Sequence, residues 1–238
     1  MTRRKAIRLL GAKNYDRLKR PLDLVWSYRK NSYSQNGEDV YLGHFFKGQD
    51  TGFYVDVGAF HPRQFSNTYS LYKRGWQGIN IDANRSAISL FRTVRPRDMN
   101  VFAAISDTPA AVEFHKWGNN SGNTLSPLTA KAMAAENGPP AEIEVLETCR
   151  LADILSQHIS EHQPIDLLNV DVEGLDLAVL KSNDWSKYRP RVVVVEEFAF
   201  SLPDLLDSAI YQYLTSLDYT LAAWLPPSII FKAANKPQ

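Results

Sequence analysis

Residues 52–62 read GFYVDVGAFHP, and this stretch decides how the fold begins. An apolar strand runs into Asp56, one glycine follows at Gly58, and the bulky residues FHP complete the turn. A strand, a tight turn and a helix in this order open the βαβ unit of nucleotide-binding folds. A dinucleotide site, however, needs the spacing G-x-G-x-x-G, and a P-loop needs G-K-[ST] after its glycines. Neither pattern is present, so the turn predicts a ligand without a diphosphate.

The rest of the chain alternates between strand-like and helix-like segments. Strands are expected at 52–57, 77–82, 100–105, 165–170 and 191–197, and helices at 66–75, 85–94, 150–159, 175–182 and 203–217. Helices of about ten residues between strands imply a parallel sheet covered on both faces. We therefore predict a doubly wound, mostly parallel α/β fold. A strand pair around Pro226–Pro227 is expected to add an antiparallel C-terminal edge strand.

The alternation of strands and helices breaks at about 108–148. We predict an insertion there that shapes the site for the molecule on which the protein acts, its acceptor. Two strand-like stretches, 110–117 and 140–147, flank a polar loop. Inserted loops on α/β scaffolds commonly carry specificity. The loop places Trp117 near three asparagines, a composition that suits a sugar face and its hydroxyls but equally suits a turn. These asparagines are Asn119, Asn120 and Asn123.

Composition and charge limit the class of protein. The chain has 238 residues, of which 44% are hydrophobic and 22% charged, as in ordinary globular proteins. Residues 1–20 hold eight Lys or Arg against Asp16 alone, so their net charge is +7 and that of the remainder is −6. We predict a basic N-terminal arm over 1–31 and a single domain over 32–238. The arm is a candidate contact for anionic lipid or a protein partner, whereas the acidic body argues against a nucleic-acid partner.

The sequence shows no recognisable secretory signal and has a single cysteine, and both observations favour a cytoplasmic protein. Cys149 is the single cysteine, so no intramolecular disulfide can form. No stretch is apolar over the length needed to span a bilayer. The first 20 residues are too basic, and their apolar part is too short, for a secretory signal.

Acidic residues follow three successive strands, where ligands of such sheets bind. Asp82 ends the second strand, 24 residues after Gly58, where a carboxylate can accept hydrogen bonds from both hydroxyls of a ribose. A cofactor with an adenosine part and no phosphate fits this turn, and S-adenosylmethionine is the obvious one. The candidate cofactor-binding residues are Asp56, Gly58, Ala59, Asp82, Ala83, Ser106 and Asp107.

Several motifs together resemble the FkbM-type methyltransferases. They read SYSQNGEDVYL, GFYVDVGAFHPRQFSNTYSLYKRGWQGINIDA, AISD and IDLLNVDVEGLDLAVLKSNDWSKYRPRVVVVEE, and they lie between Ser32 and Glu197. The resemblance implies a class I, S-adenosylmethionine-dependent fold with a seven-stranded sheet, and O-methyltransferase activity, often on sugars. It also implies that Asp56 and Gly58 belong to the cofactor loop and that Asp82 holds the ribose. Related sequences often have His where this chain has Phe60, which implies a pocket of different shape.

Transfer of a methyl group to a hydroxyl requires that the hydroxyl proton leave, either to a base or under the influence of a metal. Asp171, Glu173 and His61 are the candidate catalytic residues, because they follow strands at the predicted site. In the alternative, Asp171 joins Glu196 or Glu197 in an all-oxygen Mg²⁺ site.

The same acids also have a purely structural interpretation. In it, Glu173 caps a helix and Glu196 pairs with an arginine such as Arg191. This interpretation stays open at the level of the sequence.

The sequence thus favours an O-methyltransferase that acts on a hydroxyl of a sugar or glycoconjugate. A nucleic-acid amino-methyltransferase usually carries [DNS]-P-P-[YFW] after the fourth strand, where this chain has DVEG. The alternative from another class is a non-catalytic scaffold or binding subunit of a glycan assembly complex.

Overall fold

The computed structural model describes residues 13–14, 31–118, 121–160 and 162–234. Residues 32–238 group into one compact unit. The expected basic arm lies almost entirely outside the described residues, as do Asn119 and Asn120 of the polar loop.

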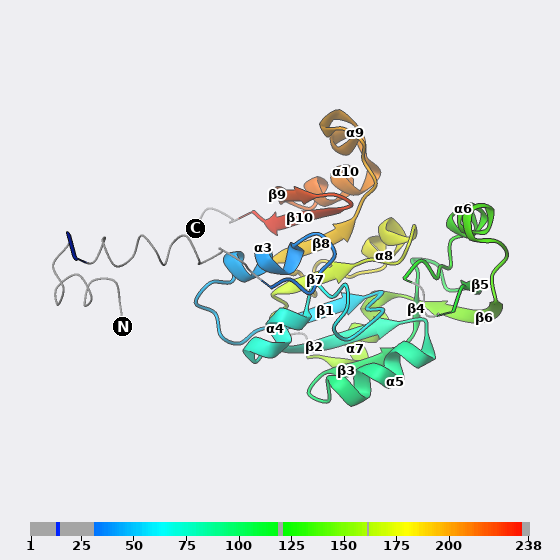
Figure 1. Ribbon diagram of the computed structural model, residues 1–238, viewed down its shortest axis with the longest axis horizontal. Coiled ribbons are helices and arrows are strands. Elements are labelled where there is room, and N and C mark those ends of the chain that lie inside the picture. The colour runs from blue at the N-terminus through cyan, green and yellow to red at the C-terminus, as the bar shows by residue number, and fades with distance from the viewer. Residues whose placement is uncertain (1–12, 15–30, 119–120, 161, 235–238) are drawn as a thin grey trace. The chain divides into compact units, whose positions relative to one another are not determined.

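A seven-stranded sheet forms the centre of this unit (Figure 1). Its strand order is β3-β2-β1-β7-β8-β10-β9, and the first five of these strands run parallel. The expected α/β fold with a mostly parallel sheet is confirmed, and it is consistent with a Rossmann-like architecture. The strands are β1 (Phe53–Val57), β2 (Gln77–Asp82), β3 (Met99–Phe102), β7 (Leu167–Val170), β8 (Val192–Glu196), β9 (Tyr219–Leu225) and β10 (Ser228–Ala233).

The expected antiparallel C-terminal edge strand is present, and it is β9. The last strand, β10, is antiparallel to β8, but it lies inside the sheet, and β9 occupies the edge. The stretch Ser228–Phe231 of β10 is completely buried, whereas most of β9 is only partly buried. The more apolar of the two strands therefore takes the inner position.

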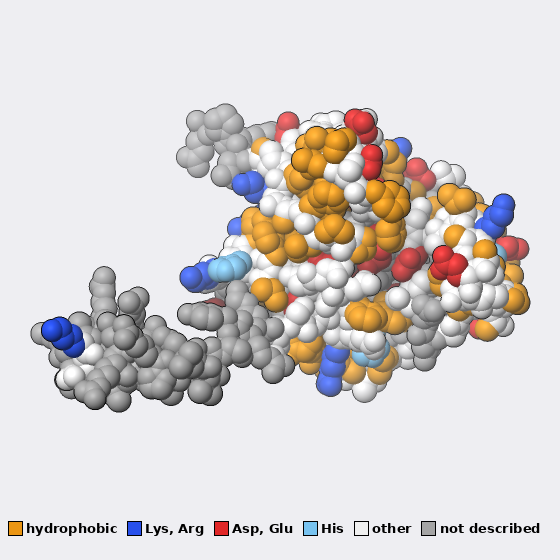
Figure 2. Space-filling view, turned by 45° about the horizontal axis from the view of Figure 1, so that its top comes forward, with side chains coloured by type: hydrophobic (Ala, Val, Ile, Leu, Met, Phe, Trp, Pro, Cys, Tyr) orange, Lys and Arg blue, Asp and Glu red, His pale blue; other side chains and the backbone are white. Residues whose placement is uncertain are grey.

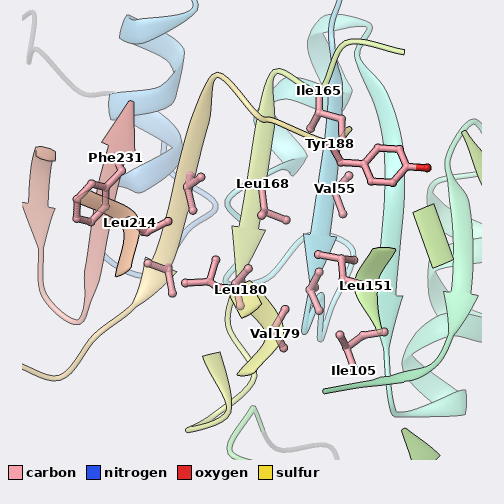
Figure 3. Close-up of a cluster of buried hydrophobic side chains, with 14 of the residues drawn as sticks. Val55, Ile105, Leu151, Ile165, Leu168, Val179, Leu180, Tyr188, Leu214 and Phe231 are labelled. Atoms are coloured by element: carbon pink, nitrogen blue, oxygen red, sulfur yellow. The ribbon is translucent and has the colours of Figure 1, made fainter. Parts of the chain in front are cut away.

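Helices cover both faces of the sheet, because alternate residues of its strands face opposite ways. Val193 and Val195 of β8 pack in a cluster with α7 (Leu151–His158), α8 (Asp176–Lys181) and α10 (Ala209–Ser216), part of which Figure 3 shows. Val192 and Val194 pack on the other face with α3 (Glu38–Phe45) and the loop after α4 (Tyr69–Arg74). The remaining outer helices are α5 (Arg85–Val94) and α9 (Leu202–Asp207).

The helix expected over 203–217 is broken in two at Ser208. The backbone of this residue is extended (φ −67°, ψ 146°), and its hydroxyl accepts a hydrogen bond from the backbone N–H of Tyr211. Such a serine starts a new helix rather than continuing the previous one. No helix in the described ranges is both long and apolar enough to cross a membrane.

A small second sheet carries the predicted insertion. Its order is β4-β6-β5, from β4 (Ala104–Ile105), β5 (Ala111–Lys116) and β6 (Glu142–Cys149). The single strand expected at 100–105 is therefore split at Ala103 between the two sheets. The sequence analysis missed α6 (Pro127–Asn137), although Ser126 and Pro127 form a recognisable helix start.

Hydrophobic side chains also gather on the surface after β8 and on α9 (Figure 2). The most exposed of them is Phe200, at 98%. This surface consists of Phe198, Phe200, Leu202 and Leu206.

Candidate functional site

A cavity opens beyond the carboxyl ends of β1, β2 and β7, against the small sheet. It encloses about 580 Å³, counting the part open to solvent. The walls are mostly apolar, and carboxylates lie at the end of β2 and in the segment after β7. Its apolar lining includes Phe60, Ile81, Ala83, Ile105, Phe114 and Leu125.

Asp82 ends β2 inside this first cavity. One carboxylate oxygen accepts the backbone N–H of Phe60 at 2.8 Å, and the other accepts that of Asn84 at 2.7 Å. Each oxygen keeps a further lone pair for a ligand hydroxyl. Burial raises the pKa of Asp82 to about 6, against the opposing effect of the two backbone hydrogen bonds.

Gly58 lies where the chain leaves β1 and passes the end of β7. Its φ of 77° is left-handed, and a Cβ at this position would collide with the backbone carbonyl of Asp171. Its N–H and that of Ala59 both donate to the carbonyl oxygen of Ile81, at 2.9 and 3.1 Å. The turn therefore contacts both the end of β2 and the segment after β7, and only glycine fits at position 58.

A second, more polar cavity adjoins the first. It encloses about 380 Å³, counting its open part. Five residues line both cavities, so the two spaces meet at the Gly58 turn and at two acids. These shared residues are Gly58, Phe60, Ser121, Asp171 and Glu173.

Asp56 lies at the back of the second cavity in a buried network. Its carboxylate accepts the hydroxyl of Thr68 at 2.6 Å and the side-chain amide of Asn169 at 2.9 Å. The buried guanidinium of Arg95 donates to the same Thr68 hydroxyl at 2.8 Å. Burial raises the pKa of Asp56, and the Thr68 hydrogen bond and Arg95 oppose this rise. Both carboxylate oxygens of Asp56 are thus already engaged by the protein.

Three carboxylates converge beside the junction of the two cavities, and two of them, Asp171 and Glu173, line both cavities. One oxygen each from Asp171, Glu173 and Glu196 lies within 4.8 Å of the others. Burial and the nearby negative charges raise all three pKa values, that of Glu173 to about 7. Oε2 of Glu196 is buried and has no hydrogen-bond partner among the described residues. Carboxylates this close repel one another when all are charged, so the cluster needs a bound proton or cation to offset the repulsion.

The structural interpretation of these acids is wrong. Asp176, not Glu173, accepts the N–H groups before α8, from Val172 at 3.0 Å and Gly174 at 3.1 Å. Arg191 pairs with Asp166 at 2.7 Å instead of Glu196.

Three other predicted site residues are not brought to the cavities. The ring nitrogen Nδ1 of His61 accepts the backbone N–H groups of Arg63 and Gln64, at 3.1 and 2.9 Å. His61, Ser106 and Asp107 line neither of the two cavities. The roles predicted for these three residues stay predictions.

Trp117 is held in place by hydrogen bonds within the protein. Its indole N–H donates to the carbonyl oxygen of Gly138 at 2.9 Å, and its backbone N–H donates to Asn123 at 2.7 Å. Asn123 itself lines the first cavity.

The sequence analysis missed several residues of the second cavity. A role for Asn169 could have been predicted, because it is the one polar residue in the otherwise apolar strand Leu167–Val170. Asn67 falls within the helix expected over 66–75, but that helix begins only at Tyr69, so Phe65 and Asn67 both stand in an irregular loop. For the metal site the sequence left Glu196 and Glu197 as alternatives, and the geometry selects Glu196.

Comparison with known families accords with this geometry. Residues 56–221 match the model of the methyltransferase FkbM domain. The chain belongs to the FkbM methyltransferase family. A search of curated proteins gave no match. The FkbM match begins at Asp56 and includes both cavities' acids, so the site described above lies inside the family domain.

Proposed function

We propose that this FkbM protein is an S-adenosylmethionine-dependent O-methyltransferase that methylates a hydroxyl of a sugar or glycoconjugate. The observation that carries the proposal is the first cavity, which combines a single-glycine turn, a carboxylate at the end of β2 and two acids after β7, Asp171 and Glu173. Glu196 at the end of β8 converges on these two acids. A seven-stranded sheet with helices on both faces supports the class I fold that the family resemblance implies.

The residues present fit the cofactor. At Gly58 the turn passes directly against the backbone of Asp171, where a Cβ would collide, and the turn offers no cradle for phosphates. Asp82 has lone pairs for ribose hydroxyls beside apolar walls that suit an adenine ring, among them Ile81 and Phe114. The bound cofactor supplies a methyl group on a positively charged sulfur.

The protein itself must hold the acceptor hydroxyl in line with the bond from the sulfur to the methyl group. It must also remove the proton of that hydroxyl. Positioning alone can lower the barrier by roughly 7–11 kcal/mol. Glu173 is the preferred general base, because it lines both cavities and its pKa of about 7 lets it gain or lose a proton near neutral pH. Burial of Glu173 and the negative charge of Asp176 favour its protonated form.

The metal-assisted alternative uses the same three carboxylates. Oxygen ligands from Asp171, Glu173 and Glu196 are those that Mg²⁺ prefers. Transfer that survives treatment with a chelator supports the base, whereas transfer restored only by Mg²⁺ or Mn²⁺ supports the metal.

Calorimetry with S-adenosylmethionine tests the cofactor. We expect micromolar binding to the wild type, loss of at least tenfold in affinity for Asp82→Asn, and no binding of NAD. Asp153→Asn, an exposed acid on α7, is the matched control and should bind normally. Absence of cofactor binding would refute the proposal. Binding without transfer to any acceptor would favour a scaffold.

A further inference from the structure

Four large hydrophobic side chains are exposed close together in the sequence, after β8 and on α9 (Figure 2). We call them the apolar surface, and between 41% and 98% of each side chain is exposed. A whole aromatic side chain has about 150–250 Å², so the four together expose roughly 500 Å². The largest apolar patch of a typical monomer has about this size and is often functional. The apolar surface consists of Phe198, Phe200, Leu202 and Leu206.

The chain segments that carry the apolar surface are held against the core. Ala199, between the two phenylalanines, packs against the main hydrophobic cluster. Leu205, between the two leucines, is completely buried. The hydroxyl of Ser201 accepts the backbone N–H of Asp204 at 3.3 Å and so fixes the start of α9. The fold itself therefore turns these four side chains toward solvent.

The apolar surface lies in an acidic part of the chain. Residues 192–231 contain five Asp or Glu and no Lys or Arg. Asp204 and Asp207 are exposed on α9 and, three residues apart, lie on the same side of the helix. The nearest basic residues along the chain, Arg191 and Lys232, lie at the amino end of β8, whereas the apolar surface follows its carboxyl end. Apolar area and negative charge are thus combined here.

This combination disfavours two kinds of occupant. A second copy of the same surface would bring like charges together, and roughly 500 Å² is less than the about 800 Å² that each partner buries in a stable complex. A membrane surface carries anionic lipids, which attract Lys and Arg and repel carboxylates. A segment that has both apolar side chains and positive charge avoids these repulsions.

We propose that the apolar surface is the docking site for a basic amphipathic helix of a partner protein. The apolar side chains of that helix, three and four residues apart, cover the two phenylalanines, and its Lys or Arg residues face Asp204 and Asp207. Exposed ion pairs add little affinity, so the covered rings supply most of the binding energy and the charges select the partner.

The docking site lies beside the candidate functional site but is separate from it. Glu196 of the carboxylate cluster precedes Phe198 by two residues, so a docked helix lies at the same end of the sheet as the cluster. No member of the apolar surface lines either cavity. Docking therefore does not depend on the proposed function.

Fluorescence anisotropy with a labelled peptide tests the docking site on the full-length protein. The probe is a peptide of Leu and Lys, about 18 residues long, in which Leu recurs every three or four residues. The comparisons are a scrambled peptide of the same composition and a peptide of Leu and Glu with the same spacing. At low salt we expect micromolar binding of the probe alone. Phe200→Ser should weaken it at least tenfold. Asp204→Asn combined with Asp207→Asn should weaken it about threefold at low salt and less at high salt.

Val145→Ser is the matched control, because Val145 is also exposed and lies opposite an exposed acid, Glu113, in the small sheet. It should bind the probe like the wild type, and circular dichroism should show that both serine variants are folded. The docking site is overturned if the probe does not bind, if the scrambled peptide binds equally, or if Phe200→Ser binds like the wild type.

Two further measurements address the other occupants. A dimer seen in analytical ultracentrifugation that Phe200→Ser dissociates would replace the proposed partner by a second copy. Sedimentation with phosphatidylglycerol vesicles that Phe200→Ser abolishes would replace it by a membrane. We expect the wild type to show neither a dimer nor vesicle binding that depends on Phe200.

Discussion

Gly58 and Asp171 approach so closely that no side chain fits between them. The contact joins the turn after β1 to the segment after β7, and both cavities are built around it. The geometry of the site therefore depends on a missing side chain as much as on those present.

Substitution of Gly58 by alanine should lower the free energy of unfolding by about 2–5 kcal/mol, from left-handed strain together with overpacking. Gly48→Ala is a matched control, because Gly48 also has a left-handed φ (85°) but nothing within 4 Å of its Cβ position. It should lose only about 1–2 kcal/mol. Urea denaturation measures both, and equal losses would show that the Asp171 contact is unimportant.

Cofactor affinity should depend on the protonation of Asp82. The pKa of its carboxyl group is about 6 because burial disfavours the charged form. Ligand hydroxyls donate to the carboxylate, so protonation below pH 6 removes the favoured acceptor, and affinity should fall by up to tenfold per pH unit. Calorimetry between pH 5 and pH 8 measures this. Asp82→Asn should bind weakly and should lack the fall in affinity below pH 6, and a wild-type profile without this fall would exclude Asp82 as the ribose ligand.

Stability should also depend on pH through Glu173. The pKa of its carboxyl group is raised from 4.5 to about 7 in the folded state, so between these values the folded state binds more protons than the unfolded chain. This contribution is therefore largest at low pH and is lost as the pH rises toward 7. Glu173→Gln should stabilise the protein more at pH 8 than at pH 5, relative to wild type. Thermal unfolding at both pH values gives the comparison, and the same difference at each would contradict it.

Arg95 should be a major determinant of stability. Its replacement by methionine leaves the hydroxyls of Ser66 and Thr68 without their donor and removes the positive charge beside Asp98. Loss of one partner from such a buried set costs about 3–5 kcal/mol. Arg92→Met changes an exposed arginine on the same helix and should stay within about 0.5 kcal/mol of wild type. Similar midpoints in urea for both variants would argue against the network.

Hydrophobic patterns predicted the main sheet well, because runs such as Val192–Val195 are buried on both sides and have few alternative structures. They did not reveal that the chain changes sheets at Ala103, since β3 and β4 together read as one apolar run. Nor did they place β10 inside the sheet, because strand order depends on pairing and not on the periodicity of one strand.

Parts of the site were predictable for a related reason. Asp82 ends β2 and Asp171 follows β7 directly, and the ends of such parallel strands meet at a common edge. The direction of a side chain several residues into a loop is set by local hydrogen bonds. His61 bonds to the backbone of its own turn, so nearness in sequence to Gly58 did not bring it to the cavity.

Because Asp171 and Glu173 border both cavities, the binding equilibria of two ligands at this site are coupled. Whichever ligand arrives first changes the electrostatic potential at these carboxyl groups and hence how many protons they carry. The second ligand then meets a site of different charge, although no backbone atom need move. By thermodynamic reciprocity the effect is the same in either order. Dissociation constants measured for each ligand alone should therefore not describe the ternary complex, and proton uptake during assembly should vary with the buffer pH.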